Sequence, residues 1–426
     1  MRLRFISLAA VVLLPYSAAQ AQTAHQYEPS GSGSAPKIVL SGQLRERLTY
    51  LDNFNFDPDH PDNGWFLAQR AAVTADAEIT PELRARVTLQ SGLLEGPAFE
   101  PIQRNDLDIQ EAYLEFGPKN AFVRVGRQEV GLGSYRLVSN RDGTNLKRTW
   151  DGIRGIAQLG DFELQAMALS EVVVQPEGAF NDPVAEGDTL AGVYLTGPAP
   201  LGKFDAYFLY SGFDARRTIE GTAEQDRYTI GARWFGDNGR VFWNAEGFYQ
   251  FGNHGDLDIS AWSVAANVGL RLEGAPWKPE IMLSANIASG DSENGDGKLG
   301  TFDALFPRGN YFSQAAILGP SNFTNINPSI RAFPDPDLEL FANVNFHWRL
   351  EEEDGVYGPP FILFREPGDS DARFVNTSVT AGAKWQVTPN LQFAVIGTYS
   401  APGRFIEETG PAENISYLEF TTNVTF

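Results

Sequence analysis

The sequence predicts an all-β fold: a single transmembrane, antiparallel, up-and-down β-barrel of about 18 strands, with short periplasmic turns and long extracellular loops. Three observations predict it. Segments of alternating hydrophobicity recur along the chain, tight and long connections alternate between these segments, and the last segment ends on an aromatic residue. Each of the first two features is typical of barrels that span an outer membrane.

The alternation has a period of two residues. In the segment 84–90, Ala85, Val87 and Leu89 share one face of an extended chain and polar residues occupy the other. The segment 262–272 repeats this pattern. Successive side chains of a β-strand point to opposite faces, so each segment presents one apolar and one polar surface. Many segments are 10–16 residues long, which suffices for the ~9–11 tilted residues of a transmembrane strand.

The connections alternate in length, which a soluble β-sandwich has no reason to do. Short turns on one side and long loops on the other are typical of outer-membrane barrels. The tight connections are expected at 80–81, 117–120, 160–161, 197–202, 236–239, 274–277 and 388–390, and the long ones at 51–64, 92–105, 129–149, 171–187, 214–225, 291–337 and 401–414.

A count of strand directions completes the topology. If the chain enters from the periplasm, the strand 278–290 runs outward, 338–350 returns, and 372–388 must also return. A short outward strand is therefore expected at 361–366, with 351–358 as its periplasmic turn, which gives the even total that bacterial barrels require. The other strands are expected at 37–50, 65–79, 82–91, 106–116, 121–128, 150–159, 161–170, 188–197, 203–213, 226–236, 239–251, 258–273, 390–400 and 415–426.

Both ends of the chain carry export signals. Residues 1–21 combine Arg2 and Arg4 with an apolar run and a small-residue cleavage box, which is the pattern of a secretory signal peptide. Residues 22–36, rich in Ser, Gly and Pro, are expected to form a flexible periplasmic leader, and 37–426 the barrel. The amphipathic last strand ends on Phe426, which resembles the signal that barrel-assembly machinery recognises in its clients.

Composition excludes several functions. The chain has no cysteine, so disulfides and thiolate metal sites are impossible. Its formal charge of −21 argues against nucleic acid as a partner. The alternative enzymatic function is that of a barrel hydrolase. However, the sequence has no G-x-S-x-G motif, and only His347 of the four histidines is expected in the lumen. We therefore expect no enzymatic activity.

Several blocks resemble the alginate-export family of outer-membrane porins. The resemblance covers the chain from about residue 40 to its end, in the order of the family's blocks. It implies an 18-stranded barrel in the outer membrane whose lumen carries an acidic polysaccharide outward, although it does not fix the solute. The blocks lie at 125–137 (VGRQEVGLGSYRL), 140–154 (NRDGTNLKRTWDGIR), 288–291 (ASGD), 301–307 (TFDALFP) and 399–405 (YSAPGRF).

Strand parity assigns a row of basic residues to the lumen. Guanidinium groups pair bidentately with carboxylates and stay charged, so they suit a uronate polymer, and a positive ring selects anions. The expected pore-lining residues are Arg45, Arg47, Arg70, Arg84, Arg86, Arg124, Arg154, Arg233, Arg271, Arg349 and Lys384.

The loop after the fifth strand adds four basic residues, Arg136, Arg141, Lys147 and Arg148, which could fold inward as a constriction. The alternative is that the basic residues are neutralised by acidic residues of the lumen, namely Asp76, Glu78, Glu111, Glu115, Glu246 and Glu280. Glu46 does not fit the pattern, because it falls on the lipid-facing side of the first strand. Either that strand contains a bulge or the assigned register is wrong.

Asp291, Glu293 and Asp296 are the best candidates for a metal site. Oxygen ligands at alternating positions near glycine suit Ca²⁺, but the downstream Glu of an EF-hand is missing. A solvated loop of turn residues is the other interpretation. No cofactor is required for the expected function.

The sequence thus predicts an outer-membrane channel for an anionic polysaccharide such as a uronate polymer. A passive porin for small anionic solutes is the alternative, since the same arginines would serve it, and a non-conducting anchor is a third. Besides its cargo, the expected partners are outer-membrane lipid and lipopolysaccharide, the barrel-assembly machinery and periplasmic export proteins.

Overall fold

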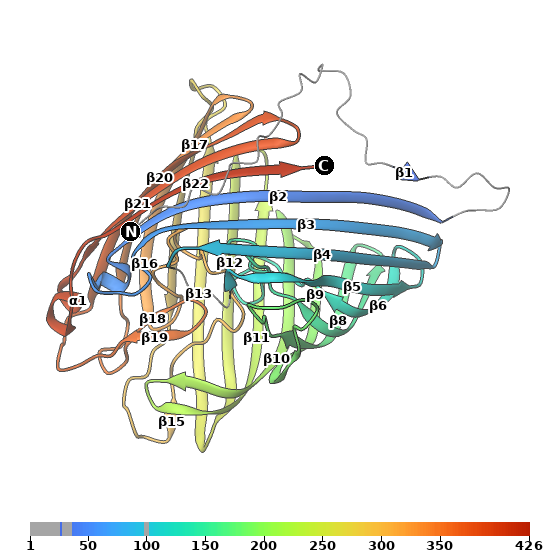
Figure 1. Cartoon of the computed structure of the whole chain (residues 1–426). Coiled ribbons are helices and arrows are strands. Elements are labelled where there is room, and N and C mark those ends of the chain that lie inside the picture. The colour runs from blue at the N-terminus through green and yellow to red at the C-terminus, as the bar shows by residue number, and fades with distance from the viewer. Residues whose placement is uncertain (1–25, 28–35, 98–101) are drawn as a thin grey trace.

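The computed structural model describes residues 26–27, 36–97 and 102–426. In this part of the chain, 18 antiparallel strands form one closed barrel, which confirms the predicted fold class. The first and last barrel strands close it by pairing from Gln43↔Thr425 to Asp52↔Ser416 (Figure 1). The barrel strands are β2 (Lys37–Asp52), β3 (Gly64–Thr80), β4 (Leu83–Glu95), β5 (Asn105–Phe116), β6 (Ala121–Gln128), β7 (Trp150–Leu159), β8 (Phe162–Val172), β9 (Val184–Ala199), β10 (Gly202–Thr218), β11 (Gly221–Asp237), β12 (Val241–His254), β13 (Leu257–Arg271), β14 (Glu280–Ala288), β16 (Phe323–Asp335), β17 (Leu338–Trp348), β20 (Phe374–Thr388), β21 (Leu391–Pro402) and β22 (Ile415–Thr425).

The remaining elements are short. Two of them, β18 (Val356–Gly358) and β19 (Ile362–Arg365), form a separate two-stranded sheet. The others are β1 (Gln26–Tyr27), which pairs with β2, β15 (Lys298–Leu299), which runs parallel to β13, and the helices η1 (Phe54–Phe56) and α1 (Arg404–Thr409). No helix in the described residues is long and apolar enough to cross a membrane. The predicted signal peptide, 1–21, lies outside the described residues, as does most of the leader, 22–36.

The eighteenth strand is not where the sequence placed it. The outward strand expected at 361–366 is wrong, because these residues belong to the small β18–β19 sheet. The missing strand is β16, which pairs with β14 on one side and β17 on the other. Residues 336–337 form the periplasmic turn, so β17 runs outward instead of returning, and 351–358 lies in an outer loop.

The connections follow the expected asymmetry with two exceptions. The hairpins β10–β11 and β12–β13 are closed on the outer side by residues 219–220 and 255–256 alone. The long loop expected at 214–225 is therefore wrong: β10 and β11 simply extend beyond their neighbours, past a bulge between Phe213 and Arg216.

Side chains alternate across the barrel wall as expected. In β2, Leu44 and Leu48 face outward and are about half exposed, whereas Arg45 and Arg47 face inward and are buried. Glu46 does face the lipid side, and its carboxylate accepts a hydrogen bond from Gln69 (3.0 Å) on β3. The pairing of β2 is unbroken there, so the strand has no bulge and the assigned register is right.

The chain end folds back onto the first barrel strand. Phe426 exchanges two backbone hydrogen bonds with Gly42 (2.9 and 3.1 Å), and its ring lies where a side chain at position 42 would stand. A Cβ at Gly42 would come within 2.2 Å of that ring. Glycine at position 42 thus leaves room for the Phe426 ring beside the junction of β22 and β2.

Part of the lumen is filled by two loops. Residues 129–149 and 289–322 fold inward and meet through a bridge between Val138 and Phe306. Both loops pack against inward-facing apolar residues of the strands β8 to β13, such as Leu190 and Leu209. The loop 289–322 also reaches the strands β2, β20 and β22, where Ile317 and Leu318 belong to one buried cluster with Leu51, Val375 and Tyr417.

Candidate permeation pathway

The strands β2 to β7 form a basic wall. Their period-two alternation directs Arg45, Arg47, Arg70, Arg124 and Arg154 to the lumen, where all but Arg124 are buried to at least 90 %. Neighbouring inward positions on adjacent strands are paired, so guanidinium groups lie side by side: Arg45 is opposite Arg70, and Arg124 is opposite Arg154.

The periplasmic half of this wall is neutralised by carboxylates. Glu115 binds two arginines, Arg84 at 2.7 Å and Arg124 at 2.6 Å. Arg86 binds Asp76 at 2.7 Å and lies 3.5 Å from Glu111. The paired alternative weighed from sequence therefore describes this part of the lumen.

Further around the barrel the basic residues have mixed partners. Arg233 pairs with Asp205 (2.9 Å), and Arg271 pairs with both Asp237 and Glu280 (2.7 and 2.8 Å). Two others differ. Arg154 donates to the neutral amide of Gln165, and Lys384 lies 5.2 Å from the ring of Phe341. Neither has a carboxylate at ion-pair distance among the residues that the structure describes.

Arg349 is not a pore-lining residue. It follows β17 in an outer loop, and its buried guanidinium donates to the backbone carbonyl oxygens of Ala372 and Glu352 (2.7 and 2.6 Å). It also lies over the ring of Phe405 on α1 at 4.2 Å. Its expected role in the lumen is therefore wrong: it fastens two outer loops together.

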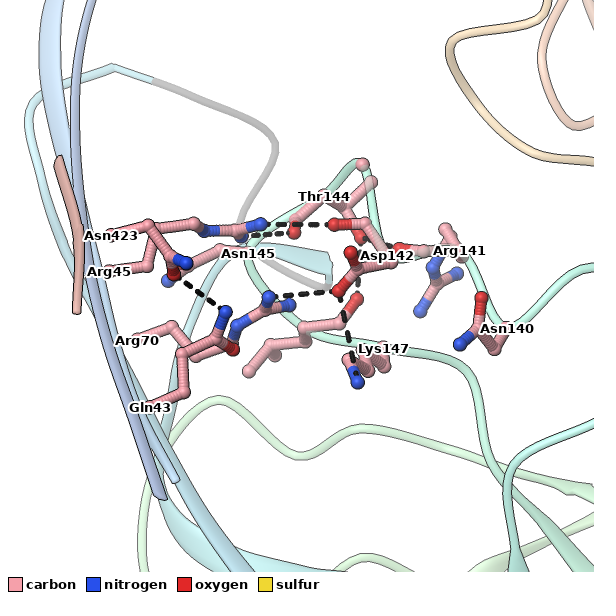
Figure 2. Close-up of polar contacts among 12 residues, drawn as sticks. Gln43, Arg45, Arg70, Asn140, Arg141, Asp142, Thr144, Asn145, Lys147 and Asn423 are labelled. Atoms are coloured by element: carbon pink, nitrogen blue, oxygen red, sulfur yellow. Dashed lines mark hydrogen bonds and ion pairs between the residues drawn. The ribbon is translucent and has the colours of Figure 1, made fainter. Parts of the chain in front are cut away.

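Three arginines of the basic wall hold the tip of the loop 129–149. Arg45 donates to the carbonyl oxygens of Asp142 and Thr144 (3.0 and 2.5 Å), as Figure 2 shows. Arg47 donates to the carbonyl oxygen of Gly143 (2.6 Å), and Arg70 binds the Asp142 carboxylate (2.8 Å). We call this set of contacts the loop latch. It brings the loop across the lumen to β2 and β3.

The electrostatics of the latch favour the charged form of Asp142. Burial raises the pKa of this carboxyl, but Arg70, Lys147 and Arg45 outweigh it and hold the pKa below its ordinary value. The carboxylate therefore stays ionised in the physiological range and keeps its two ion pairs, with Arg70 and with Lys147 (3.8 Å).

The basic residues of the loop mostly serve the loop itself. Arg136 reaches the opposite wall, where it binds Glu246 (2.9 Å) and Asn267 (2.8 Å). Lys147 pairs with Glu129 (3.2 Å). Arg148 pairs with Glu171 at 2.8 Å and lies 5.2 Å from the Phe306 ring, and Arg141 is enclosed within the loop. The loop narrows the lumen, but these side chains are tied into its framework.

Sequence reasoning missed Arg308 and the polar strands that it faces. Arg308 lies on the second inward loop, 289–322, with an exposed side chain. Together with Arg136 and Tyr311 it borders a cavity of about 270 Å³ whose other side is lined by asparagine and serine residues of β12, β13, β14 and β16. The sequence predicts one long outer loop over 291–337, which is wrong, because 289–322 folds inward and 323–335 is a barrel strand.

The calcium ligands expected from sequence are not brought together. Within the described residues no group of three His, Cys, Asp or Glu side chains could hold a metal ion. Asp296 instead accepts a hydrogen bond from the backbone of Lys298, whereas Asp291 is buried beside Asp354. Burial, and then the charge of Asp354, raise the pKa of Asp291 to about 6.

His347 faces inward as expected but is enclosed by aromatic rings. It stacks on Phe323 at 5.3 Å and lies edge-on to Phe312 at 5.5 Å. His347 is therefore part of the buried packing between β16, β17 and the inward loop.

Comparison with known proteins agrees with this architecture. The family model described as alginate export matches residues 37–417. No curated protein matches the chain. Crystal structures similar to it include OccAB3 of Acinetobacter baumannii (TM-score 0.63, 11% identity) and, from Pseudomonas aeruginosa, OccK3 (0.62, 12%) and OccK2 in complex with glucuronate (0.61, 13%); each alignment covers 91% of this chain and 99%, 95% and 98%, respectively, of theirs. At these identities the likeness shows the fold.

Proposed function

The chain belongs to the alginate export family and is an outer-membrane channel, and we propose that it passes an anionic polysaccharide of the uronate class. One observation supports the cargo most directly: the guanidinium groups of Arg45, Arg47 and Arg70, on the adjacent strands β2 and β3, meet the tip of the inward loop 129–149. A guanidinium group binds carboxylates bidentately, and a series of them offers a polyanion successive binding sites.

Three of the four latch contacts end on backbone carbonyl oxygens, which are weaker partners for arginine than carboxylates are. Arg70 also binds Asp142, and Arg47 lies 3.3 Å from Glu419 of β22, so Arg45 is the one of the three without a carboxylate at ion-pair distance among the described residues. A carboxylate of a passing polymer can therefore replace the carbonyl oxygens one at a time. Arg154 and Lys384 extend the positive path, because no carboxylate of the described chain pairs with them.

A porin for small anionic solutes is the second candidate. Two inward loops narrow the lumen, which would restrict the size of the solute. A structurally similar barrel, OccK2, has been solved with glucuronate, a single sugar acid. The arginines of the basic wall in the present chain would attract such a small sugar acid.

Planar-bilayer recording of the refolded protein tests both candidates. We expect an anion-selective reversal potential in a salt gradient, and current block by oligouronates that lengthens with the oligomer. Replacing Arg45 and Arg47 by Gln should weaken the block. Arg404→Gln is the matched control, because Arg404 is exposed on α1 outside the lumen. Anion selectivity with equal block by monomers and oligomers would favour the small-solute porin, and a cation-selective barrel would contradict both.

A further inference from the structure

A straight row of neutral side chains crosses the wall opposite the basic wall. Asn244, Asn267, Ser284 and Asn327 occupy consecutively paired inward positions on β12, β13, β14 and β16. We call these four residues the amide row. All four are half-buried, so they border the lumen without being sealed in the wall.

A second set of asparagines stands beside the amide row and supports it. Asn286 donates to Asn325 (2.7 Å), and Asn325 donates to Asn345 (2.6 Å). These three are at most 8 % exposed. Their side-chain amides are thus linked to one another. In the amide row itself, the Ser284 side chain forms no hydrogen bond within the described part of the chain, and the Asn327 side chain has only a long one, to Asn343 at 3.3 Å.

Asparagine is a poor strand former, so this accumulation needs a reason. Thr or Ser would make a water-filled lumen equally hydrophilic, and β20 and β21 have such residues at inward positions, namely Thr380, Thr398 and Ser400. The amide differs from a hydroxyl because it presents two donors and an acceptor in a fixed plane. Neighbouring strands are ~4.8 Å apart, so the side-chain donors and acceptors of the row recur at a distance comparable with the width of a sugar ring.

Three guanidinium groups lie at the amide row: Arg233 donates to Asn244 (3.1 Å), Arg136 donates to Asn267 (2.8 Å), and Arg308 borders the same space. Arg308 and the row line the same cavity of about 270 Å³, which also contains Arg136 and Tyr311. Arg136 is committed to Glu246, whereas Arg308 forms no ion pair within the part of the chain that the structure describes. The volume lies just below the ~300–1,000 Å³ of sites for drug-sized ligands. It therefore suits one small polar unit.

We propose that this cavity is a subsite for one sugar-acid unit, in which Arg308 binds the carboxylate while the amide row hydrogen-bonds the ring hydroxyls. The inference rests on the proposed function and adds the basis of its selectivity. The basic wall attracts any polyanion, because its interaction with the solute depends on charge alone. The amide row adds a requirement for hydroxyl groups, so the channel distinguishes a polyhydroxylated acid from a plain polycarboxylate.

The test compares current block by three probes: an oligouronate, an oligoglutamate of equal length and charge, and a neutral malto-oligosaccharide. We expect the oligouronate to block at least ~10-fold more tightly than the oligoglutamate, since each neutral hydrogen bond contributes roughly 3- to 10-fold. The double variant Ser284→Ala/Asn327→Ala should remove this difference and leave block by oligoglutamate unchanged. Arg308→Gln, on an exposed loop position, should weaken block by both acids and leave the neutral sugar unaffected.

Asn423→Ala is the control, because Asn423 is another half-buried inward asparagine, on β22, bonded to Gln43 (2.6 Å) and outside the cavity (Figure 2). Equal block of the wild type by the two acids would overturn the subsite while leaving the anion channel intact. An equal effect of Asn423→Ala and the double variant would also overturn it. A wild type without anion selectivity would instead contradict the proposed function on which the subsite rests.

Discussion

Releasing the loop latch should make the single-channel conductance switch between levels. Arg45→Met is the most selective substitution for testing this. Both hydrogen bonds of Arg45 go to backbone carbonyl oxygens of the loop tip, so its removal leaves no carboxylate unpaired. Methionine keeps the length and apolar stem of the side chain. The variant therefore weakens the latch and changes little else in the wall.

The magnitude follows from the two lost contacts. A hydrogen bond that involves a charged group contributes ~1.5–3 kcal/mol. Part of this is offset, because Arg45 is only 6 % exposed and lies among Arg47 and Arg70, so its removal relieves desolvation and like-charge repulsion. A net loss of ~1–3 kcal/mol raises the equilibrium constant for loop release roughly 5- to 150-fold.

Single-channel recording at high salt measures this release, because screening there suppresses the general effect of a lost charge. We expect brief transitions to a higher conductance that the wild type rarely shows. Arg154→Met is the matched control, since it removes the same charge from the lumen but contacts Gln165 and not the loop. Identical traces from the two variants, or a silent Arg45→Met, would refute the latch.

Three further outcomes follow from the described contacts. Arg86→Gln leaves Asp76 and Glu111 unpaired on the lumenal wall, so the reversal potential in a salt gradient should move toward cation selectivity; an unchanged potential would count against it. Phe306→Ala removes a ring that is 2 % exposed and packs on Trp150 at 4.6 Å, so it should cost ~3–5 kcal/mol and lower the temperature at which the folded barrel changes gel mobility. Asp291→Asn should stabilise the barrel above pH 6. The pKa of Asp291 is raised in the folded state, to about 6 against 3.8, so the folded state binds the proton more tightly and the wild type loses up to ~3 kcal/mol of unfolding free energy as the pH rises from 4 to 6. Unfolding curves of the two proteins should therefore converge below pH 4.

The strand pattern was readable because each strand must present apolar side chains to lipid. The strand β16 is not predicted from the sequence, and the reason is physical. Pro328 and Pro334 lie within it, and Pro lacks the N–H that a strand interior uses. The barrel tolerates Pro328 because it is paired with Leu283 of β14, while the pairing with β17 is interrupted between Ile326 and Ser329.

The partners of the lumenal charges were only partly predictable. Hairpin register places Glu115 opposite both Arg84 and Arg124, so this neutralised cluster follows from strand positions alone. The contact between Arg136 and Glu246 joins a loop to a strand more than 100 residues away. No local pattern encodes such a pair, because the loop path depends on what fills the lumen.

Yet the sequence does carry a signal that the lumen is filled on one side. Strand parity puts Leu169, Leu190 and Leu209 on the inward face of β8, β9 and β10, where a wet lumen should show polar residues. Apolar side chains on that face require an apolar partner inside the barrel. Only the inward loops can supply one, and the apolar residues Val138 and Phe306 of those loops meet this need. Inward apolar positions thus mark strands against which apolar parts of the loops pack, whereas inward basic positions such as Arg45 and Arg70 meet the polar tip of the loop 129–149.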